Sequence, residues 1–335
     1  MVDYITNDDT IIFAYKFNKT LDLKLINKYK KLIFSNYVLD NDLFDKYNNN
    51  NLQYTRSIFN QEVNNLPNSL THLTFGHYFN QEVNNLPNYL THLTFGFEFD
   101  QEVNNLPNFL MQLTFNHYFD QEVNNLPNSL THLIFGHCFN QEVNNLPNSL
   151  THLTFGYNFN QKVNNLPNSI THLNFYGCFN QKVDNLPNSL THLTFGWDFN
   201  KKIDNLPNSL THLTFDNKFN QKVDLSCNIK YLKLNCNNQH LIDYLPNSVE
   251  ELVLDCYFNL ELNNLPTSIK KISFNTYNEY NKELNCLPNF IELLQLPRNY
   301  NKKIFKIPQE LKKLICYEKY IYINDYNNIN VESYK

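Results

Sequence analysis

The sequence lacks the features of a membrane protein, a secreted protein or a common enzyme. No apolar run in its 335 residues approaches the ~20 that are needed to cross a bilayer. Residues 1–9, MVDYITNDD, are acidic and have no apolar core, so we expect no secretory signal. The GxSxG, P-loop and HExxH motifs are all absent. We therefore expect a protein that is not an enzyme, has no cofactor and does not enter a membrane.

Charged residues and cysteines also lack the patterns of a nucleic-acid or metal site. The formal net charge is −5, and no run of Lys and Arg alternates with aromatic residues as in a nucleic-acid groove. The seven cysteines have no CxxC spacing. Their odd number, with no secretory signal expected, indicates reduced thiols and a cytoplasmic location.

What the sequence does have is a 20-residue period. FNQEVNNLPNSLTHLTFGHY, at 59–78, returns with small changes up to residue 224. Twelve of the 13 prolines occupy one position of this repeat. Proline has a fixed φ and no N–H, so this position is expected to be a corner of the chain. The asparagines beside it are expected to stabilise the same corners through their side chains.

Each repeat predicts one strand and one return segment. Residues 70–75, LTHLTF, alternate apolar with polar residues, which is typical of a half-buried strand. The apolar residues over 79–86 are three or four apart, which favours an irregular or short helical return. A 20-residue unit cannot bury its own apolar face, so successive repeats must stack around a shared core. The core positions expected in one unit are Leu70, Leu73, Phe75, Phe79, Val83 and Leu86.

Two known repeats are similar to this unit. L-x-x-L-x-F over 70–75 resembles the leucine-rich repeat, and the longer pattern FNQ…V…LPNSLTHLTFG resembles the FNIP repeat of social amoebae and of large DNA viruses of amoebae. The resemblance implies a leucine-rich-repeat-like solenoid with a parallel β-sheet on the concave side and one short strand per turn. It also implies protein binding and, for a viral protein, the cytoplasm of the host cell. We expect regular repeats over 58–224, degenerate repeats over 225–317, and a cap or tail over 318–335.

Residues 1–57 differ from the repeats and are expected to form a small helical cap. Asp9 or Thr10 could begin a first helix, a second would begin near Asp22, and a short third would cover 41–51. Such a cap would cover the open edge of the first turn. FNIP arrays are often preceded by an F-box, so the resemblance also implies an F-box-like module over 7–48. That module would bind a Skp1-type adaptor and make the protein a substrate receptor of a cullin-type ubiquitin ligase, although the usual Leu-Pro opening is absent.

A histidine recurs at one strand position, between two inward-facing residues. The ladder consists of His72, His92, His132, His152, His172, His192 and His212, and Gln112 fills the gap. Imidazoles in a row disfavour charging one another, so a pH-responsive rod is one alternative function. A metal-responsive rod is another, but a metal needs ligands that converge from different directions, and we expect no metal site.

The three residues after each strand vary, although the rest of the unit is nearly constant. This rim starts at 76–78, GHY, and is rich in aromatic residues, which supply contact area for protein binding. Loop positions can also vary for lack of constraint. We predict that the concave strand face and the rim bind a protein partner of unknown identity. The candidate binding residues are His77, Tyr78, Phe97, His117, Tyr118, His137, Tyr157, Tyr176 and Trp197.

Overall fold

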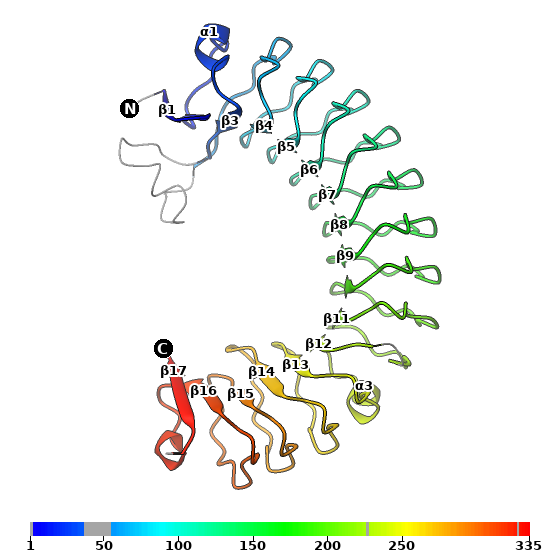
Figure 1. Ribbon diagram of the computed structural model, residues 1–335, viewed down its shortest axis with the longest axis vertical. Helices are drawn as coiled ribbons and strands as arrows, with labels where there is room; N and C mark the ends of the chain where they lie inside the picture. Colours follow the sequence, from blue (N-terminus) through cyan, green and yellow to red (C-terminus); the bar gives the residue numbers. More distant parts are fainter. Residues whose placement is uncertain (1–2, 37–54, 226–227, 327) are drawn as a thin grey trace. The chain divides into compact units, whose positions relative to one another are not determined.

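The chain winds in short turns that each add one strand to a parallel sheet (Figure 1). The computed structural model describes residues 3–36, 55–225, 228–326 and 328–335. They belong to two compact units, Met1–Ile170 and Thr171–Lys335. None of the helices in the described part of the chain has the length and apolar character needed to span a bilayer.

In the first unit the strands follow one another in chain order. They are β1 (Tyr4–Asn7), β2 (Thr10–Phe13), β3 (Lys31–Phe34), β4 (His72–Thr74), β5 (His92–Thr94), β6 (Gln112–Thr114), β7 (His132–Ile134) and β8 (His152–Phe155). Strand β1 pairs antiparallel with β2, and every later pair is parallel. The register places identical residues opposite each other, with His72 opposite His92 and Leu73 opposite Leu93.

The second unit continues the same pattern with less regular turns. Its strands are β9 (His172–Phe175), β10 (His192–Thr194), β11 (His212–Phe215), β12 (Tyr231–Leu234), β13 (Glu251–Leu254), β14 (Lys271–Phe274), β15 (Leu293–Gln295), β16 (Lys313–Tyr317) and β17 (Asn330–Tyr334). All their pairings are parallel. A short helix, α3 (Gln239–Asp243), and a 3-10 turn, η1 (Ile323–Asp325), lie between strands.

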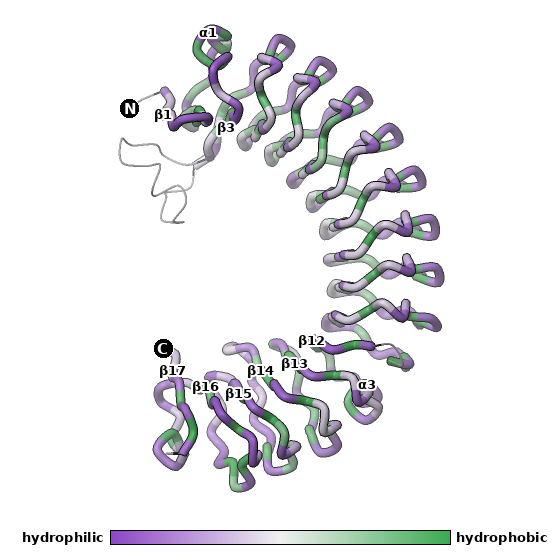
Figure 2. The backbone as a smooth tube through the Cα atoms, viewed as in Figure 1, coloured by the Kyte–Doolittle hydropathy of each residue, from purple (hydrophilic) through white to green (hydrophobic). Residues whose placement is uncertain are grey.

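The core is a set of apolar columns that run from turn to turn, as the repeat pattern predicts. Phe75, Phe79 and Leu73 are at most 2% exposed, and their equivalents are buried in the same way. The ring centroids of Phe75 and Phe79 lie 3.6 Å apart within one turn, and the centroid of Phe79 lies 6.1 Å from that of Phe99 in the next turn. Hydrophobic and hydrophilic segments alternate along each turn in Figure 2. The expected solenoid with its shared core is therefore confirmed.

Side chains at the corners join each turn to the one before it. The Oδ1 atom of Asn80 accepts hydrogen bonds from the backbone N–H of Asp100 and from Nε2 of Gln101, both at 3.0 Å. The same pair of bonds links Asn60 to the following turn. A buried backbone amide needs an acceptor, so this column holds successive return segments in register. The return segments of the regular repeats are irregular, without helix in their described residues.

The expected helical cap at the N-terminus is wrong for the residues that the structure describes. Thr10–Phe13, expected to start a helix, is strand β2, with all four residues buried. Consecutive β-branched and aromatic residues suit a strand that is covered on both faces and paired on both edges. The second helix does begin after Asp22, but α1 (Leu23–Ile26) has four residues only.

These strands also exclude the expected F-box-like module from the described part of 7–48. Residues 7–36 contribute β2 and β3 to the solenoid sheet, whereas an F-box is helical. The short helix expected over 41–51 lies outside the described residues.

Candidate functional site

The histidine ladder forms a row of stacked rings on the strand face. His72 and His92 have ring centroids 4.0 Å apart with planes 9° from parallel. The same stacking joins His132 to His152 at 4.2 Å and, in the second unit, His192 to His212 at 4.0 Å. Because successive strands are in register, identical side chains must lie one above another along the sheet.

A threonine beside each of these histidines fixes its orientation. Oγ1 of Thr91 lies 2.8 Å from Nδ1 of His92 and 3.0 Å from the carbonyl oxygen of Thr71. The carbonyl can only accept, so the threonine hydroxyl donates its single proton there and accepts from the Nδ1–H of His92. The neutral imidazole then has its lone pair on Nε2.

The surroundings of His72 and His92 disfavour the protonated forms of these two histidines. Burial holds the pKa of His72 below its ordinary range, and the nearby charges of His92 and Lys31 act in the same direction. Burial also lowers the pKa of His92, assisted by His132 and Lys31. Parallel rings do not converge on one point, which a metal ion requires. In the described residues, no three His, Cys, Asp or Glu side chains are grouped so that they could hold a metal ion.

The rim of the first unit is a second column of stacked rings. The successive centroid distances are 4.6 Å for His77–Phe97, 4.2 Å for Phe97–His117, 4.6 Å for His117–His137 and 4.9 Å for His137–Tyr157. Offset or parallel aromatic pairs at such distances are favourable contacts. From Phe97 to Tyr157 the column therefore presents a preformed aromatic edge that is half-buried at Phe97 and His117 and exposed at His137 and Tyr157.

Tyrosines increase the exposed area of this rim. Tyr78 stands edge-on to His77, and Tyr118 stands edge-on to both Phe97 and His117. Tyr78, Tyr118 and Tyr157 are all exposed. The structure thus brings most of the predicted rim residues of the first unit together.

His77 is the exception among them, because it is buried. Its side chain is covered by Tyr78 and Phe97, and its backbone N–H donates to Oδ1 of Asn36 at 2.8 Å. Burial lowers the pKa of His77, although the carboxylate of Glu98 lies 3.7 Å from Nε2. His77 therefore presents little surface to a partner, because packing in the first repeat encloses the ring, and its role in direct partner contact stays a prediction.

The second unit contains two of the predicted rim residues, Tyr176 and Trp197. Tyr176 is exposed, whereas Trp197 is half-buried and stands edge-on to Tyr257 at 5.2 Å. Tyr257 lies three residues after the end of β13, in a degenerate repeat beyond residue 224, where the near-constant pattern that located the rim no longer holds.

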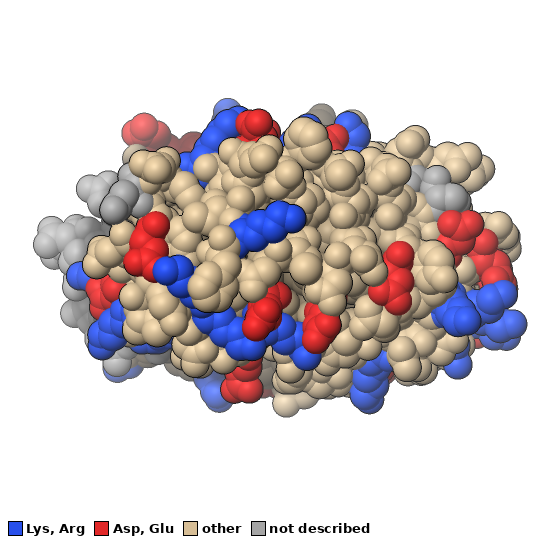
Figure 3. All heavy atoms as spheres, turned by 90° about the horizontal axis from the view of Figure 1, so that it is seen from below, with Lys and Arg blue, Asp and Glu red and all other residues tan. Residues whose placement is uncertain are grey.

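After β11, the strand face of the second unit carries alternating charges in place of the Thr–His pairs. Glu250 lies 2.9 Å from Lys270 and 3.7 Å from Lys230, and Glu292 lies 2.8 Å from Lys312. Acidic and basic side chains are interspersed on the face shown in Figure 3. Exposed ion pairs of this kind contribute little to stability, but they give the two units different electrostatic surfaces.

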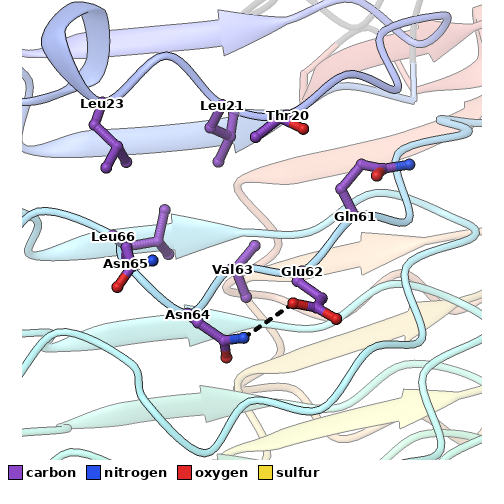
Figure 4. Close-up of a pocket in the computed structure, with 9 residues that line it drawn as sticks. All are labelled: Thr20, Leu21, Leu23, Gln61, Glu62, Val63, Asn64, Asn65 and Leu66. Atoms are coloured by element: carbon purple, nitrogen blue, oxygen red, sulfur yellow. Dashed lines mark hydrogen bonds between the residues drawn. The ribbon is translucent and has the colours of Figure 1, made fainter.

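A hollow of about 360 Å³ lies between the first turn and α1. Residues 20–23 and 61–66 line it, and in Figure 4 the amide of Asn64 faces Glu62, which accepts a hydrogen bond at 3.2 Å. The same Asn–Glu bond recurs in later repeats. The hollow is therefore a product of the repeat geometry and contains no distinctive chemical group.

Stacked 20-residue turns, a parallel sheet and an exposed polar strand face define a leucine-rich-repeat-like solenoid. The FNIP Repeat model matches residues 59–98, 99–138, 139–178, 162–196, 179–218, 219–257 and 244–277, and the chain belongs to this family.

The solved structure of CroV588 agrees with this fold. The crystal structure of CroV588, described as a novel circular LRR protein, has a TM-score of 0.69 and 33% identity over 95% of this chain. The chain spans 58% of the length of CroV588. YopM from Yersinia enterocolitica WA-314 has a TM-score of 0.32 and 18% identity, over 75% of this chain and 74% of that chain. No curated protein matches the chain.

Proposed function

We propose that this protein is a non-enzymatic scaffold that binds a protein partner through its strand face and its aromatic rim. The observation that carries the proposal is the rim column, where exposed aromatic rings differ between turns that are otherwise nearly identical. Large, preformed aromatic surfaces supply contact area at low entropic cost, and they are enriched among the residues that dominate binding energy. Leucine-rich-repeat-like solenoids are typical of such scaffolds.

A comparative capture experiment tests the proposal. Full-length protein, a Tyr118→Ala/Tyr157→Ala variant and a Tyr244→Ala variant would each be used to retain proteins from a cell extract. Tyr244 is exposed but follows α3, away from the rim, so it is a matched control. We expect at least one protein to be retained by the wild type and by the control variant and to be lost with the rim variant. The absence of any such protein would overturn the rim as the binding surface.

A pH-responsive rod is a second candidate, because stacked imidazoles line the strand face and the pKa values of two of them, His72 and His92, are lowered. It is tested by the pH dependence of stability given in the Discussion. For either function we propose the cytoplasmic location that the cysteine content predicts.

A further inference from the structure

Two adjacent turns of the first unit break a rule that the other regular repeats follow. Serine occupies the position two residues after the proline at Ser69, Ser129, Ser149, Ser169, Ser189 and Ser209. Its hydroxyl donates to a carbonyl of the preceding turn, for example from Ser129 to Leu110 at 2.6 Å and from Ser149 to Leu130 at 2.6 Å. At the two remaining positions the residue is Tyr89 or Phe109, so this bond between turns is lost.

The substituted side chains form an exposed apolar patch. Tyr89 is 61% exposed and Phe109 is 57% exposed, and their rings stack 5.8 Å apart with planes 18° from parallel. Met111, 45% exposed, stands where other turns have the threonine that bonds to the ladder histidine. We call Tyr89, Phe109 and Met111 the apolar patch.

The patch replaces stabilising polar contacts with apolar side chains exposed to water. Each lost hydrogen bond between turns is worth about 1 kcal/mol. Leu110, between Phe109 and Met111, is fully buried, so the core of this turn is intact and the change is confined to its outer side. Exposed apolar groups gathered in this way mark interaction sites rather than ordinary surface.

The stretch of sequence that carries the patch has charges of one sign. Residues 57–161 contain eight carboxylates and no Lys or Arg. Five of the eight, at 98, 100, 102, 120 and 122, belong to the turns that carry or follow the patch. Such a surface attracts cationic groups and repels anionic ones.

We propose that the apolar patch docks a basic segment of a partner protein, in which Lys or Arg residues alternate with apolar side chains. This inference rests on the proposed function and specifies the chemistry of the partner. The apolar side chains of the segment pack against the Tyr89–Phe109 pair, and its cationic side chains are attracted by the carboxylates of these turns. An anionic lipid surface or a second copy of this acidic unit would be repelled.

The repeat itself supplies the test variant, Tyr89→Ser/Phe109→Ser/Met111→Thr. These substitutions install the residues that the other turns carry, so they restore the hydrogen bonds between turns. The variant should therefore melt at the same temperature as the wild type or higher, while losing the docking surface. A purely structural role for the patch would give the opposite result, with lower stability.

Binding would be measured by fluorescence anisotropy with three labelled peptides and the full chain. One alternates Lys with Leu and Phe, a second has Glu in place of Lys, and a third has Ser in place of Leu and Phe. We expect the first peptide to bind the wild type most tightly, and to lose roughly tenfold or more in affinity for the restored variant. Tyr244→Ser, an exposed tyrosine elsewhere, is the control and should bind as the wild type does.

Two results would overturn the proposal. If the restored variant binds the first peptide as tightly as the wild type, the patch is not the docking surface. If the Glu peptide binds as tightly as the Lys peptide, the assigned charge of the partner is wrong. Neither result affects the capture experiment, which tests the rim independently. A scaffold that binds its partner through the rim alone is therefore distinguished from a protein that binds no partner.

Discussion

Replacing Phe139 with alanine should destabilise the first unit strongly. The side chain of Phe139 has no exposed surface. Its ring centroid lies 3.7 Å from that of Phe135 in the same turn, and 6.0 Å from those of Phe119 and Phe159 in the turns on either side. Truncation therefore removes contacts within one turn and across both of its interfaces.

The magnitude follows from two contributions. Loss of the buried apolar surface of a phenylalanine costs about 2 kcal/mol. A ring-sized hole of roughly 80 Å³ adds about 2 kcal/mol at about 24 cal/mol per Å³. The sum, about 4 kcal/mol, lies within the range of about 3–5 kcal/mol for Phe→Ala changes in protein cores.

Urea denaturation followed by circular dichroism would measure this loss. Tyr157→Ala is the matched control, because it removes an exposed aromatic ring one turn away. We expect the control to lose less than about 1 kcal/mol, as most surface substitutions do. Equal losses for the two variants would refute the assignment of the phenylalanine columns to the core and of Tyr157 to the surface.

Three further predictions concern the histidine ladder, the asparagine column at the corners and the ion pairs of the second unit. Burial holds the pKa of His92 below its ordinary value of 6.5, so on acidification the unfolded chain binds more protons than the folded chain does. The melting temperature should therefore be constant above about pH 7 and should fall as the pH drops below 6.5. His92→Gln should make that fall smaller in a thermal scan at several pH values. Asn80→Ala leaves the N–H of Asp100 without its acceptor and should lose about 1–3 kcal/mol in urea denaturation, whereas Asn80→Asp retains an acceptor and should lose much less. Glu250→Lys places like charges beside Lys270 and should lower the melting temperature, by an amount that shrinks as salt is added.

The repeated part of the fold could be predicted because every signal recurs many times. Alternation over 70–75 predicted the strand, and a 20-residue unit with one apolar face left stacking as its only means of burial. Near-identical neighbours also predicted the register, since any slip would place Leu73 opposite a polar residue.

The first strands could not be predicted in the same way. A short run such as Ile11, Ile12 and Phe13 suits a helix or a buried strand equally well by local pattern. The choice depends on whether a neighbouring strand is available, and β1 and β3 supply that partner from elsewhere in the chain. The local sequence alone does not determine this pairing.

The candidate site was predicted in part for a related reason. Variation after each strand located the aromatic rim, but the burial of His77 depends on Asn36 and on packing that no repeat pattern contains. The signal for the apolar patch was present in the sequence, as Tyr89 and Phe109 in a column of serines. The repeat pattern did not predict a site there, because an isolated change at an otherwise constant corner produces no periodic signal.

The pairing of like with like across the sheet has a consequence for how this protein can change. Leu93 meets Leu73 on one side and Leu113 on the other, so both faces of a turn are complementary to any other turn of the regular array. When a 20-residue copy is duplicated or deleted, the turns that become neighbours therefore still present matching residues to each other. The gene can gain or lose whole turns in a single recombination event without disturbing the fold, and each new copy is then free to acquire its own surface residues.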